Sequence, residues 1–99
     1  IATFPPVRSG IRGNLAAEYI LSTNSALKTL AAAKVASGRK VYVVDLYAAM
    51  VGQENTLIGD DGLHPTVAGY RRIAETFMTA IRTAYEQAAA PSSLSLIKR

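Results

Sequence analysis

The sequence predicts an α/β fold with parallel strands. Two segments with helical periodicity, about residues 16–37 and 65–88, alternate with two short β-rich segments at 1–4 and 41–46. Such alternation is typical of parallel strands joined by right-handed crossovers. The chain has 99 residues, of which 49% are hydrophobic. That is enough for one small domain with a core, and it excludes a disordered chain.

The first strand is expected at residues 1–4 (IATF), and the prolines at positions 5 and 6 end it because proline has no N–H to donate to a ladder. Residues 7–14, with two glycines and an asparagine, are expected to form a loop. A chain that begins with isoleucine inside a strand is unusual. We therefore expect the natural protein to continue upstream.

The first helix is expected from about residue 16 to residue 37. This segment is rich in alanine, the best helix former, and Gly38 supplies a C-terminal stop. Its apolar residues recur at the spacing of one buried helix face. They are Ala16, Ile20, Ala26, Leu27, Leu30, Ala31 and Val35.

The second strand, at residues 41–46, is a continuous apolar run instead of an alternating one. That pattern suits a strand buried on both faces of a parallel sheet. Residues 48–63 are expected to be mostly loop. Two strands do not complete a sheet of this kind, so the fold is expected to be incomplete on its own.

The second helix is expected from Pro65 to about residue 88, since proline fits the first helical turn. Residues 91–99 (PSSLSLIKR) are expected to be a flexible tail, which leaves residues 1–90 as the domain. The apolar stripe of the helix comprises Val67, Ile73, Ala74, Phe77, Ile81 and Ala84.

Composition removes several classes of function. There is no cysteine, which excludes disulfides and thiolate metal sites. The net charge is +4, and the basic residues are spread along the chain, so we expect a solvated surface and no nucleic-acid partner. A basic binding module would rest on net charge alone. No apolar run approaches the ~20 residues of a membrane span, and no signal peptide is visible.

The single histidine, His64, follows Asp61 by three residues in a glycine-flanked turn. A general base for a serine needs one imidazole nitrogen facing the nucleophile and the other held by a carboxylate. A D-x-x-H turn can do this if Gly62 lets the backbone bend back. The same spacing also occurs in ordinary turns. Asp60 with this pair could be read as a metal cluster, but three ligands within five residues is poor geometry, and no metal or cofactor is expected.

The surroundings of this turn resemble a known family. Residues 61–70 (DGLHPTVAGY) closely resemble the last conserved block of the SGNH/GDSL serine hydrolases. That block reads D-G-x-H-P, two variable residues, a small residue, glycine and an aromatic. Residues 43–46 (VVDL) resemble the family's last core strand. Residues 24–27 (NSAL) and the strand that ends in the two prolines resemble the segment before it, so that the resemblance covers about 1–88.

The resemblance implies that this chain is the C-terminal β-α-β-α part of a three-layer α/β/α, flavodoxin-like sheet. His64 matches the family's general base and Asp61 the carboxylate that orients it. The family's serine lies in a G-D-S motif, and its oxyanion donors include a glycine and the asparagine of a G-x-N-D motif. Neither motif occurs in this sequence. A missing N-terminal segment is therefore expected to supply them.

The expected function is that of an esterase or lipase acting in the whole protein, with the 99-residue chain inactive alone. Family substrates include lipid esters, acetylated sugars, aryl esters and thioesters, and family members are often secreted. The alternative is a catalytically inactive fragment or subunit that pairs with another chain through exposed strand edges.

The remaining charged candidates have structural interpretations. Asp45 is expected to cap or hydrogen-bond a neighbouring loop, and Asp60 to be a turn residue. Arg8 and Arg12 could contact a substrate anion, but a solvated loop is the preferred interpretation.

Overall fold

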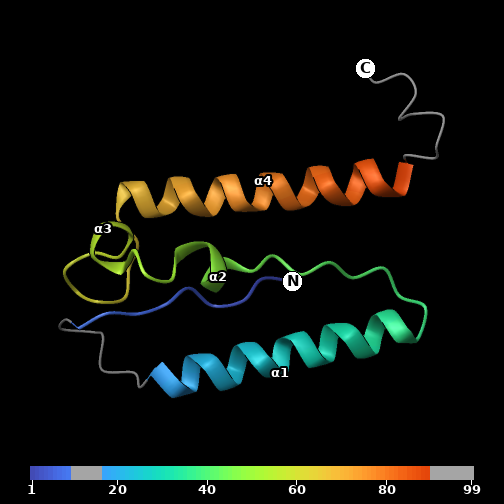
Figure 1. Cartoon of the computed structure of the whole chain (residues 1–99), viewed down its shortest axis with the longest axis horizontal. Helices are drawn as coiled ribbons and strands as arrows, with labels where there is room; N and C mark the ends of the chain where they lie inside the picture. Colours follow the sequence, from blue (N-terminus) through green and yellow to red (C-terminus); the bar gives the residue numbers. More distant parts are fainter. Residues whose placement is uncertain (10–16, 90–99) are drawn as a thin grey trace.

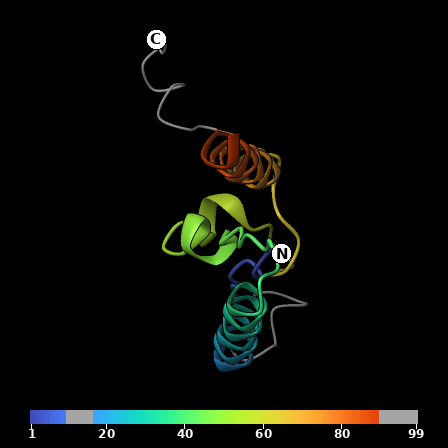
Figure 2. The same ribbon diagram turned by 90° about the vertical axis from the view of Figure 1, so that its right-hand side faces the viewer.

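The computed structural model describes residues 1–9 and 17–89. Figure 1 shows these residues in three layers, with one long helix on each side and the extended segments and two short helices between them. The view at right angles in Figure 2 shows the same order of layers. The helices are α1 (Ala17–Ala36), α2 (Leu46–Met50), α3 (Glu54–Leu57) and α4 (Val67–Ala89).

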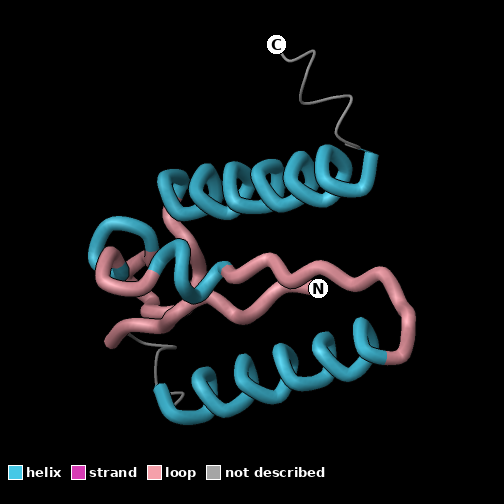
Figure 3. Tube along the Cα trace, turned by 45° about the vertical axis from the view of Figure 1, so that its right-hand side comes forward, coloured by secondary structure: helices cyan, strands magenta, loops and turns pink. Residues whose placement is uncertain are grey.

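Two extended segments, residues 1–3 and 42–44, run parallel in the middle layer (Figure 3). Val44 carries their pairing. Its carbonyl accepts from the N–H of Thr3 at 3.0 Å, and its N–H donates to the carbonyl of Ile1 at 2.7 Å. The pairing amounts to one isolated parallel bridge.

The predicted fold class was wrong. Neither of the strands expected at 1–4 and 41–46 forms, and the described part of the chain contains helices and no strand. The structure therefore does not show the β-α-β-α part of a three-layer α/β/α sheet.

The pairing stops after one bridge because the neighbouring backbone is engaged elsewhere. The side chain of Asn24 accepts from the N–H of Phe4 at 2.7 Å and donates to its carbonyl at 3.0 Å. The prolines at positions 5 and 6 have no N–H to donate. On the other segment, Asp45 turns the chain directly into α2.

The first predicted helix is confirmed as α1, and residue 16 lies outside the described residues. Gly38 ends it as expected, with φ at +96°, a left-handed conformation that favours glycine. The predicted apolar stripe is only partly buried. Ile20 and Ala31 are buried, whereas Leu30 and Val35 are half exposed.

The segment predicted as loop at 48–63 instead contains part of α2 and all of α3. The carboxylate of Asp45 caps α2 by accepting from the N–H of Ala48 at 3.1 Å, so its expected capping role is confirmed. A buried hydrophobic cluster lies at the two short helices and consists of Met50, Leu57 and Ile58. Ala49 and Ile73 pack against this cluster.

The second predicted helix is confirmed as α4, which begins at Val67, two residues after the expected start. Its N-terminus is fixed by Thr66, whose hydroxyl accepts from the N–H of Gly69 at 3.0 Å and donates to the carbonyl of Thr56 at 2.8 Å. Gly69 lies so close to α3 that a Cβ there would come within 2.0 Å of the carbonyl oxygen of Leu57.

Much apolar surface remains uncovered in the described residues. Seven hydrophobic residues are buried, but sixteen large ones are exposed, including Phe77, Ile81 and Tyr85 of α4. The described residues therefore leave most of the apolar stripe predicted for α4 unburied. No helix in the described ranges is long and apolar enough to cross a membrane. The tail predicted at 91–99, and most of the loop at 7–14, lie outside the described residues.

Candidate functional site

The site is built on a tight turn, residues 59–64, between α3 and α4. The N–H of Gly59 donates to the carbonyl of His64 at 2.7 Å, and the N–H of Gly62 donates to the carbonyl of Gly59 at 2.9 Å. Gly62 has φ at +82°, where a side chain would strain the backbone. This glycine lets the chain reverse so that Asp61 faces His64.

The turn brings together the two predicted site residues, Asp61 and His64. Oδ2 of Asp61 lies 2.5 Å from Nδ1 of His64. Its other oxygen, Oδ1, accepts from the main-chain N–H groups of Leu63 and His64, both at 2.9 Å. The carboxylate is thus fixed from both sides, with one oxygen on the backbone and one on the ring.

These hydrogen bonds set the charge of Asp61. The bond to His64, followed by the N–H groups of Leu63 and His64, holds the pKa of Asp61 well below its usual range. The carboxylate is therefore ionised at neutral pH. An ionised carboxylate at Nδ1 keeps the proton of a neutral imidazole on that nitrogen, which leaves the lone pair on Nε2.

The far side of the imidazole is open. The side chain of His64 is 61% exposed, against 27% for Asp61. Among the described residues, none makes a hydrogen bond to Nε2. The arrangement can therefore accept a proton from a group that approaches from outside this part of the chain.

Arg8 supports the turn, a role that the sequence did not predict. Its main-chain N–H donates to the carbonyl of Gly62 at 3.0 Å, and its Nε donates to that of Gly59 at 3.1 Å. Its Nη2 pairs with Oδ1 of Asp60 at 2.9 Å. The expected solvated loop was wrong for Arg8, whereas Arg12 lies outside the described residues. No local signal could have found these contacts, because the partners lie some fifty positions apart.

Asp60 is a turn residue, as expected, and its carboxylate is directed to Arg8. The alternative metal site with Asp61 and His64 gains no support from this placement. Within residues 1–9 and 17–89, no group of three histidine, cysteine, aspartate or glutamate side chains could hold a metal ion.

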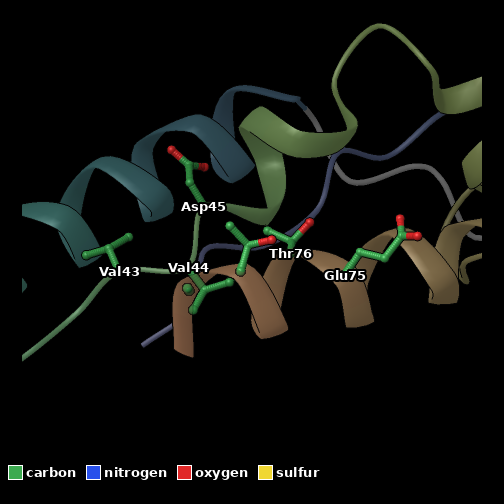
Figure 4. A pocket seen from close by; sticks show the side chains of 7 residues that line it. Val43, Val44, Asp45, Glu75 and Thr76 are labelled. Carbon is green, nitrogen blue, oxygen red and sulfur yellow. The ribbon is translucent and has the colours of Figure 1, made fainter. Parts of the chain in front are cut away.

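Asp45 belongs to a separate network. Its carboxylate contacts Nζ of Lys28 at 2.8 Å and accepts from the hydroxyl of Thr3 at 3.0 Å. Burial alone would raise the pKa of Asp45, but Lys28, the N–H of Ala48 and Thr3 together lower it. Asp45 and Glu75 both line a groove of about 370 Å³ beside α4. Figure 4 shows that the Asp45 carboxylate is directed toward α1 and away from Glu75. Asp45 thus has a structural role, because its carboxylate links α1, the N-terminal segment and the start of α2.

A second groove, of about 370 Å³, lies beside the site. Leu63 and Pro65, the neighbours of His64, both line it, and most of its other lining residues are apolar. The other lining residues are Phe4, Pro5, Pro6, Val7, Ile20 and Thr23.

Comparison with known proteins identifies the family. The model of the GDSL-like lipase/acylhydrolase family matches residues 3–77, a range that includes the 59–64 turn and the start of α4. No curated protein and no solved structure matches the chain. The match covers well over half of the 99 residues, and it confirms the resemblance seen in residues 61–70. This chain therefore belongs to the GDSL-like lipase/acylhydrolase family.

Proposed function

We propose that the chain supplies the Asp-His pair of a Ser-His-Asp triad in a carboxylic ester hydrolase. The observation that carries the proposal is the contact between Oδ2 of Asp61 and Nδ1 of His64, with Nε2 left open. Family membership supports a hydrolase, and the geometry supports the role of each residue.

In the proposed reaction, Nε2 of His64 removes the proton of a serine hydroxyl as the serine oxygen attacks the ester carbonyl. The tetrahedral intermediate collapses, the C–O bond to the alcohol breaks, and His64 donates the proton to the leaving alcohol. Water, deprotonated by the same nitrogen, then attacks the acyl-enzyme and releases the acid and the serine. Asp61 stabilises the imidazolium that forms in each half of the reaction.

The serine is the part that this chain does not supply in the proposal. The hydroxyls of Ser22 and Ser37 bond to carbonyls of α1, and no G-D-S motif occurs in the sequence. We infer that a segment outside the 99 residues, on the N-terminal side, provides the nucleophile and the oxyanion donors. An Asp-His pair without them has lost most of the catalytic machinery. The chain alone should be inactive.

The apolar groove beside Leu63 and Pro65 suggests how an ester would lie. Its lining suits a hydrocarbon part of the substrate, because burying apolar surface is favourable by about 25 cal/mol per Å². The ester carbonyl would then lie toward His64.

A second candidate function is a catalytically inactive subunit that pairs with another chain. The exposed apolar side chains favour it, since monomers rarely expose large contiguous apolar surface. Ile1, Tyr42, Phe77, Ile81 and Tyr85 gather around one open groove of about 570 Å³. A partner that covers this face could complete either an enzyme or an inert complex.

Activity and labelling separate the two functions. We expect the chain alone to give no turnover of a p-nitrophenyl ester and no labelling by a fluorophosphonate. The intact protein, or the chain mixed with its serine-bearing segment, should do both. His64→Ala should abolish turnover, and Arg82→Ala, which removes an exposed charge on α4, should not.

Three outcomes would contradict the proposal. Stoichiometric labelling of a serine within these 99 residues would show that the nucleophile is internal. Unchanged turnover in His64→Ala would remove the assigned base. An assembled protein without any esterase activity would favour the second candidate.

A further inference from the structure

Arg8 holds the 59–64 turn through its main chain and its side chain together. The main-chain N–H bonds to the carbonyl of Gly62, one residue after Asp61. The guanidinium Nε bonds to the carbonyl of Gly59, where the turn begins. Arg8 thus forms hydrogen bonds to the chain both before and after Asp61, the aspartate that contacts His64.

The guanidinium also reaches α3. Its Nη1 lies 3.3 Å from Oδ1 of Asn55 and 3.4 Å from the carbonyl of the same residue. The Arg8 side chain is only 23% exposed, whereas that of Asp60 is fully exposed. An ion pair with a fully exposed partner contributes little, so the hydrogen bonds to main-chain carbonyls carry the positioning.

The carbonyls that Arg8 binds belong to Gly59 and Gly62, the two glycines whose hydrogen bonds shape the turn. Gly59 accepts from Gly62 through its carbonyl and donates to the carbonyl of His64 through its N–H. Gly62 has its N–H bonded within the turn and its carbonyl bonded to Arg8. A shift of either glycine would move Asp61 relative to the imidazole.

We propose that Arg8 is a positioning residue for the Asp61–His64 pair. It acts through Gly59 and Gly62, keeping the carboxylate aligned with Nδ1 and the proton off Nε2. Its consequence for catalysis rests on the proposed function, whereas its effect on the imidazole does not.

The test uses the intact protein labelled with 15N-histidine, with the His64 signal assigned by its loss in His64→Gln. In the unchanged protein, the imidazole nitrogen shifts should report a proton fixed on Nδ1. In Arg8→Ala they should move toward the averaged values of a ring that exchanges between tautomers. Arg8→Lys keeps the charge but has one ammonium in place of a planar fork, so the shifts should be intermediate. Asp60→Asn and Arg82→Ala should leave them unchanged.

Kinetics give the second readout. Arg8→Ala should lower kcat by a factor on the order of 10², as small misplacements of catalytic groups do, with KM nearly unchanged. Arg8→Lys should recover part of this loss. Wild-type tautomer signals and kcat in a folded Arg8→Ala protein would overturn the proposal. If that variant does not fold, wild-type values of both in Arg8→Lys would overturn it.

The proposed function fails separately. If His64→Ala leaves hydrolysis intact, the triad assignment is wrong, while the imidazole shifts still report whether Arg8 positions the pair.

Discussion

Asp61 holds His64 at two points, because one carboxylate oxygen lies 2.5 Å from Nδ1 of the ring and the other accepts the main-chain N–H of the same residue at 2.9 Å. Ring and backbone are therefore tied to a single group. This arrangement separates the aspartate's effect on the imidazole from its effect on the turn, because each effect depends on a different oxygen.

Asp61→Asn should disable the pair while largely keeping the turn. The amide oxygen can still accept the two main-chain N–H groups, which places the NH₂ group toward Nδ1. Since NH₂ only donates, Nδ1 must become the acceptor and the proton must move to Nε2. Under the proposed function, kcat should fall on the order of 10⁴-fold, as it does when the aspartate of a Ser-His-Asp triad is changed to asparagine.

Steady-state kinetics and imidazole 15N shifts on the intact protein measure this, with Glu86→Gln on the exposed face of α4 as the control. A mutant that keeps the wild-type tautomer, or that keeps nearly full kcat, would contradict the role given to Asp61.

The low pKa of Asp61 predicts a pH dependence of stability. Its pKa in the folded protein lies below the ordinary value of 3.8, so between the two values the unfolded state binds more protons. The stabilisation is fully present above that ordinary value and is lost as pH falls through the folded pKa. Asp45 adds to this loss with the same sign.

Urea unfolding at a series of pH values from neutral to strongly acidic tests this. Asp61→Asn and Asp45→Asn should each flatten the fall in the free energy of unfolding below about pH 4, which is close to the ordinary pKa of aspartate. Glu86→Gln should leave the curve unchanged. Identical slopes in all four proteins would show that neither aspartate titrates abnormally.

The contact between Asp61 and His64 could be predicted from sequence because the two residues are three positions apart and one glycine, Gly62, allows the turn. The two long helices were also predictable, since their signals are local: alanine content, apolar periodicity and the stop at Gly38. The short helices α2 and α3, with five and four residues, are too brief to show a period, and the capping of α2 by Asp45 became visible only in the structure.

The strands failed for a different reason. A composition rich in β-formers gives a segment the propensity to form a strand, but the strand forms only where a partner pairs with it along its length. Here Asn24 occupies the backbone of Phe4, and only Val44 pairs on both its N–H and its carbonyl. Arg8 was missed likewise, because its contacts depend on the tertiary fold.

Gly69→Ala should destabilise the protein, although alanine normally stabilises a helix relative to glycine by about 0.5–1 kcal/mol. The new Cβ would meet the carbonyl oxygen of Leu57 at 2.0 Å and the Cβ of Pro65 at 2.9 Å. Both contacts are with groups that cannot rotate away, so α4 must shift. Overpacking of this kind costs about 1–3 kcal/mol.

The urea midpoint measures this effect, with Thr83→Ala on an exposed position of α4 as the matched control. The control should be neutral or slightly stabilising. A midpoint for Gly69→Ala above that of the unchanged protein would mean that the approach of α4 to Leu57 is looser than described.

Asn24→Ala should destabilise the N-terminal segment, because the asparagine serves as a hydrogen-bonding partner for the backbone of Phe4. It is 5% exposed, and removing its amide leaves the N–H and the carbonyl of Phe4 without their partners. A lost hydrogen bond costs about 0.5–1.5 kcal/mol net, so the loss of two should lower the free energy of unfolding by about 1–3 kcal/mol. Hydrogen exchange of the Phe4 amide should accelerate correspondingly, by about tenfold for each 1.4 kcal/mol lost when opening is local.

Ser25→Ala, at the exposed neighbouring position, should change neither the free energy of unfolding nor the exchange rate of Phe4. Unchanged protection of Phe4 in Asn24→Ala would show that the side chain does not hold this backbone, and would leave the end of the extended pairing at Phe4 without its cause.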